Sequence, residues 1–332
     1  MFRWFFLFGL IFLFSMAGAQ GMERYTFSQP KMGTEFRIVA YGSDPDSVSR
    51  AVQTAFARID SLNRIMSDYD PESEISLLAE KAALDPGRYY PVSEDLWTVL
   101  RQAKILSRRS RGAFDVTVGP LSKLWRRAFR RRTFPSPEAI DEARSLVNYR
   151  WLKLRSRDRA VRLKKAGMRL DLGGIAKGYT VDAVYEVLQK AGTPAVLVDG
   201  GGDIFGGMPP PGEPGWRVAA HRLRADSIRQ EIVYLKNGAI ATSGDTYRYL
   251  EWKGKRYAHI INPRTGLGMT DRRMVTVGAE SCMLADALAS TFSVVSLSKL
   301  ERLARRFGVR YRLIYLDDEG EWKVLNADYT EE

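Results

Sequence analysis

Apolar residues recur at helical spacing through most of the first half of the chain. The segment before them, 35–41, instead alternates apolar and polar residues, which predicts a strand. Ser136 and Pro137 mark the start of the last helix, as a capping residue and a proline in the first helical turn. The pattern therefore predicts helices over 48–62, 96–106, 121–128 and 137–147.

The pattern changes beyond Tyr149, where short strand-like runs are separated by glycine-rich turns. Helical spacing returns at 175–190 and 284–307, and the second helix is expected to break near Ser298, which forms a capping-box pattern with Glu301. This mixture predicts an α+β fold with mixed, largely antiparallel sheets and flanking helices. The predicted strands are 151–154, 161–164, 168–172, 195–198, 216–221, 232–235 and 256–261.

The segment from Met168 to Tyr179 is the most informative part of the chain. A predicted strand there runs into Gly173 and Gly174 and then directly into a helix. Glycines allow a close backbone approach, and the first N–H groups of a helix attract an anion, so the junction favours a phosphate site. The same arrangement is also typical of a simple packing turn, and other segments must decide between the two.

The first 19 residues have the pattern of an export signal. Arg3 precedes an apolar run from Trp4 to Phe14, and Ala17-Gly-Ala19 provides small residues at a cleavage site. We expect cleavage after Ala19, with an uncleaved membrane anchor as the alternative. The mature protein is therefore expected to be exported and periplasmic, and association with the inner membrane stays open.

Composition restricts the chemistry that the chain supports. It has one cysteine, Cys282, and two histidines, so any metal should be a hard cation bound by oxygen atoms. The net charge is +12, yet no nucleic-acid recognition module is visible. A cluster of arginines fits anionic lipid headgroups, an acidic partner or an ordinary solvated helix face. These arginines are Arg126, Arg127, Arg130, Arg131 and Arg132.

Asp286 and Ser290 are four residues apart on a predicted helix and therefore project from the same face. A carboxylate and a hydroxyl together suit magnesium, although an acidic residue near a helix start is also favoured by the helix dipole alone. His259 lies in a predicted strand and is either a packed residue or a base, whereas His221 is expected at the surface. The remaining polar patches are 112–120, 199–207, 241–245 and 257–266.

These patches, in this order, resemble the ApbE family of magnesium-dependent FAD:protein FMN transferases. The likeness spans roughly residues 30 to 295. The matching motifs are Met32-Gly-Thr34, Met66-Ser-Asp-Tyr69 with Ser73-Glu-Ile-Ser76, Gly112-Ala-Phe-Asp115, Asp171-Leu-Gly-Gly-Ile-Ala-Lys-Gly-Tyr179, Asp199-Gly-Gly-Gly-Asp203, Thr242-Ser-Gly-Asp245, His259-Ile-Ile-Asn-Pro-Arg-Thr-Gly266 and Ala285-Asp-Ala-Leu-Ala-Ser290.

The resemblance implies a T-fold-related architecture over residues 20–332, and an enzyme that moves the FMN half of FAD onto a threonine or serine hydroxyl of a target protein, releasing AMP. The acceptor would be a subunit of a membrane redox complex that carries a short flavinylation motif. Mg²⁺ would be held by Asp286, Ser290 and the main-chain oxygen of Gly174, and His259 or Asp245 would act as the base. The residues that would line the FAD site are Met32, Tyr69, Ala113, Phe114, Asp115, Asp171, Lys177 and Ile260.

The chain departs from the family pattern at two positions. Ser290 stands where the family usually has threonine, which keeps the hydroxyl but loses a stiffening methyl group. Asn262 replaces an aspartate and removes a negative charge near His259. Two other functions remain open: a hydrolase that splits FAD into FMN and AMP, and a non-catalytic periplasmic flavin-binding protein.

Overall fold

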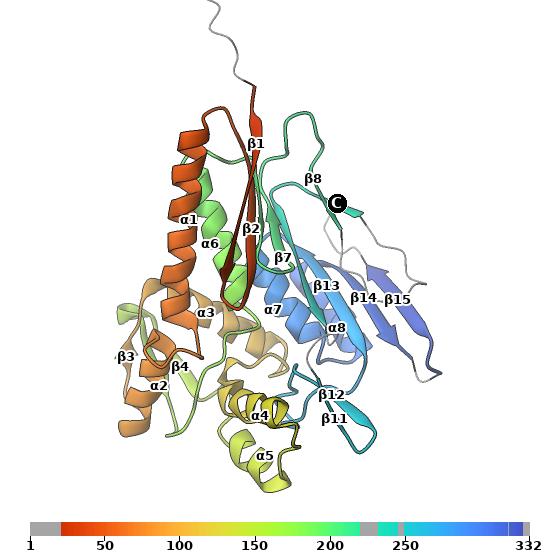
Figure 1. Ribbon diagram of the computed structural model, residues 1–332. Coiled ribbons are helices and arrows are strands. Elements are labelled where there is room, and N and C mark those ends of the chain that lie inside the picture. Colours follow the sequence, from red (N-terminus) through yellow and green to blue (C-terminus); the bar gives the residue numbers. More distant parts are fainter. Residues whose placement is uncertain (1–20, 220–231, 245–248, 318, 328–332) are drawn as a thin grey trace, which may run out of the picture.

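A long antiparallel sheet forms the centre of the protein (Figure 1). The computed structural model describes residues 21–219, 232–244, 249–317 and 319–327. The two ends of the sheet are hairpins, and the central strands come from widely separated parts of the chain. In spatial order the strands are β1 (Glu23–Lys31), β2 (Thr34–Gly42), β6 (Val196–Asp199), β7 (Asp203–Gly206), β10 (Gly238–Gly244), β13 (Arg273–Ala279), β14 (Arg310–Leu316) and β15 (Trp322–Ala327).

Both faces of the central strands are covered. Ile38 and Val198 point toward a helical layer and belong to one buried apolar cluster with residues of α1 and α6. Their neighbours Val39 and Leu197 point the other way, under the small sheet of β8 (Trp216–Ala219) and β9 (Ile232–Leu235). The helices of the layer are α1 (Pro45–Met66), α6 (Ala176–Lys190) and α7 (Cys282–Phe292).

The remaining elements lie mainly below this layer in Figure 1. Trp125 on α4 links them to the chain beyond β12, because its indole N–H donates to the Gly266 carbonyl at 2.8 Å. This contact brings the segments around 112–120 and 257–266 together. The elements are α2 (Glu74–Leu84), β3 (Tyr90–Pro91), α3 (Glu94–Arg109), η1 (Val116–Val118), α4 (Gly119–Arg131), α5 (Pro137–Arg144), β4 (Leu152–Arg155), η2 (Ser156–Asp158), β5 (Ala160–Leu163), β11 (Tyr249–Trp252), β12 (Lys255–Ala258) and α8 (Leu297–Phe307).

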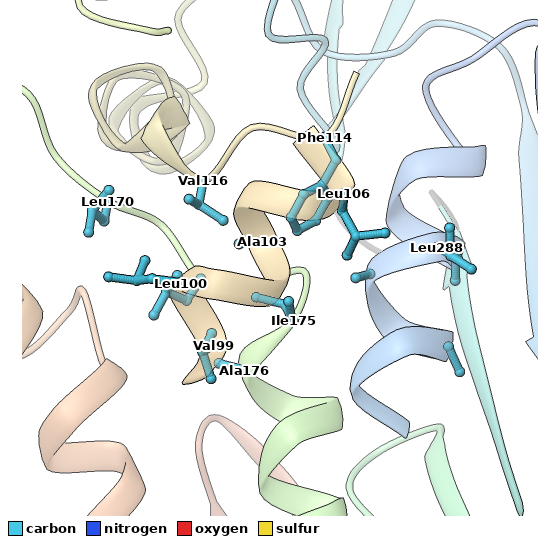
Figure 2. Close-up of a cluster of buried hydrophobic side chains, with 14 of the residues drawn as sticks. Val99, Leu100, Ala103, Leu106, Phe114, Val116, Leu170, Ile175, Ala176 and Leu288 are labelled. Atoms are coloured by element: carbon cyan, nitrogen blue, oxygen red, sulfur yellow. The ribbon is translucent and has the colours of Figure 1, made fainter. Parts of the chain in front are cut away.

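A buried apolar cluster fixes the start of α6 between α3 and α7. Figure 2 shows Val99, Ala103 and Leu106 of α3 in the same cluster as Ile175 and, on α7, Leu288. Each of these five side chains is almost fully buried. Close packing of this kind resists displacement, so the backbone at the start of α6 has a defined position relative to α7.

The predicted fold class is confirmed, as are the helices α1, α3, α4, α5 and α6, but several local predictions are wrong. Residues 168–172 do not form a strand. The Asp171 N–H donates to the Val116 carbonyl, but no further strand hydrogen bonds follow from this contact in the described chain. The segment 199–207 is a β6–β7 hairpin rather than a loop. The strand predicted at 256–261 ends at Ala258, and the late helix is two helices whose second begins after Ser296, not Ser298.

Other predictions fall at the edge of the described residues. The strand predicted at 216–221 is described only to Ala219, where β8 ends. The export signal, His221 and Asp245 lie outside the described residues. No helix of the described ranges combines the length and apolarity that a membrane span requires.

Candidate functional site

Two carboxylates, the buried Asp286 and the half-buried Asp182, lock α6 and α7 together by capping each other's helix. Asp182 on α6 accepts hydrogen bonds from the backbone N–H groups of Cys282 (2.7 Å) and Met283 (2.9 Å), which open α7. Asp286 on α7 accepts one from Gly178 in the first turn of α6, at 3.1 Å. Each carboxylate therefore satisfies donors that the partner helix cannot satisfy internally.

Glycines at two positions allow the helices to approach this closely. A Cβ on Gly178 would overlap the Cys282 carbonyl oxygen and lie 2.8 Å from the Asp286 Cβ. A Cβ on Gly174 would lie 2.8 Å from the Ser290 hydroxyl oxygen. Neither glycine has a positive φ, so both are needed for space rather than for backbone conformation. The contact places Gly174 and Ser290 side by side.

Asp286 lies in surroundings that favour its protonated form. Asp286 is 6% exposed, and burial together with the charge of Asp203 raises its pKa to about 8, despite Lys177 and the Gly178 N–H. Lys177 forms an ion pair with the buried Asp203 at 2.6 Å. Burial alone would lower the pKa of Lys177, but the carboxylates of Asp203 and Asp286 outweigh that effect and raise it. The junction thus holds two buried carboxyl groups beside one partly exposed ammonium group.

The oxygen donors at this junction fit a hard divalent cation. Asp286 and Ser290 lie one turn apart on α7, and Gly174 lies against Ser290. No group of three or more His, Cys, Asp or Glu side chains in the described chain is placed to hold a metal. A site here would therefore combine one carboxylate, one hydroxyl and a main-chain oxygen, which suits Mg²⁺ with water or phosphate completing its shell. Thr291 takes no part, because its hydroxyl donates to Ala287 inside α7 at 2.6 Å.

The Gly112–Asp115 motif borders the same junction. Phe114 is 7% exposed, and its ring lies 3.5 Å from the position that a Cβ on Gly174 would take. Ala113 is also buried. Asp115 accepts hydrogen bonds from the Thr117 N–H, the Thr117 hydroxyl and the Tyr149 N–H at 2.6–2.9 Å. The Asp115 carboxylate therefore holds the turn that positions Phe114.

Arg126 is a site residue that the sequence did not single out from its cluster. Its guanidinium pairs with Asp68 at 2.5 Å and with Asp171 at 3.0 Å, and it lies over the ring of Tyr69 at 4.0 Å. Asp171 also accepts from the Gly173 N–H at 2.8 Å. Arg126 thus ties the exposed Tyr69 to the glycine segment, and the interpretation of this arginine as part of a solvated helix face is wrong.

The other predicted flavin-site residues lie on two turns. Met32 occupies the tight β1–β2 turn with a positive φ of 49°, and its half-buried side chain packs against two apolar clusters. His259 is exposed and directly follows β12, while Ile260 is half-buried. The Asn262 side chain accepts from the Arg264 N–H at 3.0 Å, so an amide serves in this turn where a carboxylate would also serve.

Comparison with known proteins identifies the class. The ApbE family profile matches residues 32–313. The FAD:protein FMN transferase of Vibrio cholerae is 33% identical over 97% of both chains, and that of Treponema pallidum is 31% identical over 91% of this chain and 88% of its own.

Solved structures agree with this result. The flavin transferase ApbE from Vibrio cholerae superimposes with a TM-score of 0.81 and 30% identity over 92% of this chain and 97% of its own. The apo flavinyl transferase ApbE of Pseudomonas stutzeri has a TM-score of 0.81 and 28% identity over 93% and 96%. The fold is thus that of a flavin-transferring enzyme. The chain belongs to the ApbE family.

Proposed function

We propose that this enzyme transfers the FMN half of FAD to a threonine or serine hydroxyl of an acceptor protein. The observation that carries the proposal is the α6–α7 junction, where Asp286 accepts from the Gly178 N–H and Ser290 lies against Gly174 just before the helix. A helix start beside glycines suits a diphosphate, and the oxygen donors suit the Mg²⁺ that would accompany it. The names of the relatives support the reaction class.

The reaction would break the diphosphate of FAD and form a phosphoester. The acceptor hydroxyl oxygen bonds to the phosphorus on the FMN side, the bond from that phosphorus to the bridging oxygen breaks, and AMP leaves with this oxygen. A base removes the hydroxyl proton; His259 and Asp245 are the candidates. A bound Mg²⁺ would neutralise charge on the phosphate oxygens.

The protein's own contribution would be to position these groups. Asp286 and Ser290 would present their oxygens from one face of α7, and Lys177 would keep a positive charge beside them. Phe114 would close the site on the apolar side. Arg126 would hold Asp171 and Tyr69 in place for the flavin.

One incubation separates this proposal from its alternatives. The purified protein is mixed with FAD, MgCl₂ and a candidate acceptor, and the products are resolved by denaturing gel fluorescence and chromatography. Flavin fluorescence on the acceptor, with equimolar AMP, supports the transferase. Free FMN and AMP without labelling would indicate a hydrolase, and unaltered FAD would indicate a flavin-binding protein; either result contradicts the proposal.

The proposed setting is outside the cytoplasm. The support is the export-signal pattern of the first 19 residues. The acceptor would then be an exported or membrane redox subunit. A fusion of residues 1–30 to a reporter that is active only after export tests this part of the proposal, and a reporter that stays inactive contradicts it.

A further inference from the structure

A pocket lies between α2 and α4, and Tyr69 of the predicted flavin-binding set lines it. Its volume is about 370 Å³. We call it the α2–α4 pocket. Its inner wall is apolar and buried, formed by Ile75 and Ala79 of α2 and by Leu170. Phe129 of α4 also lines it.

The lining of the α2–α4 pocket is strongly basic. Lys123, Arg126, Arg130 and Arg169 line it, against the single carboxylate of Asp68. Arg126 is already engaged by Asp68 and Asp171. Within the described ranges, none of the other three cations forms an ion pair. The pocket therefore combines an apolar wall with three positive charges that lack a carboxylate.

The basic character continues onto the surface of α4. Lys123 and Arg130 are exposed, as are Arg127 and Arg131 on the same helix. Exposed cations around an open pocket suit a large acidic partner, because their long side chains can reach carboxylates that approach from solvent.

Arg126 connects the α2–α4 pocket to the candidate site. It lines the pocket and also holds Asp171, which lies two residues before Gly173. Tyr69 is the only residue that the pocket shares with the predicted flavin-binding set. A chain that occupies the pocket would therefore contact Tyr69 and Arg126, which border the predicted flavin-binding residues.

We propose that the α2–α4 pocket binds an acidic segment of the acceptor protein and thereby places the target hydroxyl at the flavin site. The inference rests on the proposed function. Aspartate or glutamate side chains of the acceptor would pair with Lys123, Arg130 and Arg169, and an apolar neighbour would contact Ile75 and Leu170.

Peptide binding tests this proposal without requiring catalysis. The probe is a fluorescein-labelled peptide with a central threonine flanked by aspartates, and its matched control has asparagine in place of each aspartate. Binding is measured by fluorescence anisotropy without FAD, at low and high NaCl. The variants are Lys123→Glu and Arg130→Glu. The matched protein control is Arg217→Glu, an exposed charge reversal on β8, which lies far from α4 in Figure 1.

The expected result is selective loss of binding. Each pocket variant should weaken binding of the aspartate peptide by ~tenfold, whereas Arg217→Glu should change its dissociation constant by less than about twofold. High NaCl should weaken binding of the peptide to the wild-type protein. Equal weakening by all three variants would show a general charge effect and overturn the proposal. If AMP displaces the peptide at concentrations near the dissociation constant of AMP for the protein, the pocket is a nucleotide site and the proposal is wrong.

Two further outcomes separate this inference from others. If Lys123→Glu and Arg130→Glu reduce binding to phosphatidylglycerol vesicles but not to the peptide, the surface recognises membrane and the proposal is wrong. The peptide experiment contains no flavin, so a failure to transfer FMN leaves its result unchanged. If the two pocket variants lose peptide binding but still transfer FMN to the acceptor at the wild-type rate, the pocket does not place the target hydroxyl, and this inference is wrong while the proposed function stands.

Discussion

Replacing Gly178 by alanine tests the contact between α6 and α7. Helix propensity alone predicts that the alanine stabilises α6 by ~1 kcal/mol, because Gly178 is a helical residue without a positive φ. The structure predicts the opposite sign. The new Cβ would overlap the Cys282 carbonyl oxygen and lie 2.8 Å from the Asp286 Cβ, so α7 must move away.

The magnitude follows from two costs. Overpacking contributes ~1–3 kcal/mol, and loss of the Gly178–Asp286 hydrogen bond contributes ~1.5–3 kcal/mol, so the net destabilisation after the propensity gain is ~1.5–5 kcal/mol. Urea unfolding of metal-free protein measures it. The control is Gly238→Ala, where the added Cβ meets nothing closer than 3.7 Å. A Gly178→Ala protein as stable as wild type would refute the close helix contact.

Four other variants test the surroundings of the site. Burial raises the pKa of Asp182 to about 7, so the folded protein keeps a proton that the unfolded chain loses near pH 4. The free energy of unfolding should therefore fall as pH rises from about 4 to about 7. In urea titrations at several pH values, Asp182→Asn should reduce this pH dependence. Arg126→Ala should destabilise the protein by ~1–3 kcal/mol, since its carboxylate partners are only partly exposed, whereas the exposed Arg127→Ala should cost less than about 0.5 kcal/mol; equal effects would contradict the pairing. Ser290→Ala should raise the Mg²⁺ concentration for half-maximal transfer by roughly tenfold while Ser290→Thr should not, and an unchanged Mg²⁺ dependence in the alanine variant excludes the hydroxyl as a ligand. His259→Ala should lower the transfer rate by ~100-fold or more, and normal turnover would exclude it as the base.

The sequence predicts the residues of the candidate site but not the contacts that assemble it. The pairing of Asp286 with Ser290 follows from helical spacing, and the Gly-Gly segment is visible as a helix start. The capping role of Asp182 is not visible, because its partners lie 100 residues away on another helix. Arg126 is hidden for a similar reason: one arginine of a basic cluster is distinguished only by Asp68 and Asp171, which tertiary structure brings to it.

The strands show the same limit. β2 alternates in burial over 35–38, which the sequence pattern predicts, whereas β13 is buried at four consecutive positions and lacks the alternation that identifies a half-exposed strand. The pattern predicts a glycine-rich loop at β7 because Gly200, Gly201 and Gly202 form the hairpin turn beside it. Residues 168–172 alternate apolar and polar side chains, but no partner strand lies beside them in the described chain. Periodicity reports burial on one face, and pairing depends on neighbours distant in sequence.

The central claim is that Asp286, Ser290 and the main-chain oxygen of Gly174 hold a divalent cation against the diphosphate of FAD. A crystal of the protein grown with FAD and Mn²⁺ in place of Mg²⁺ tests it, because manganese gives an anomalous signal. We expect a peak at about 2.0–2.5 Å from oxygens of these residues and of the diphosphate. A bound FAD whose metal lies elsewhere, or whose diphosphate is distant from the start of α6, would contradict the account.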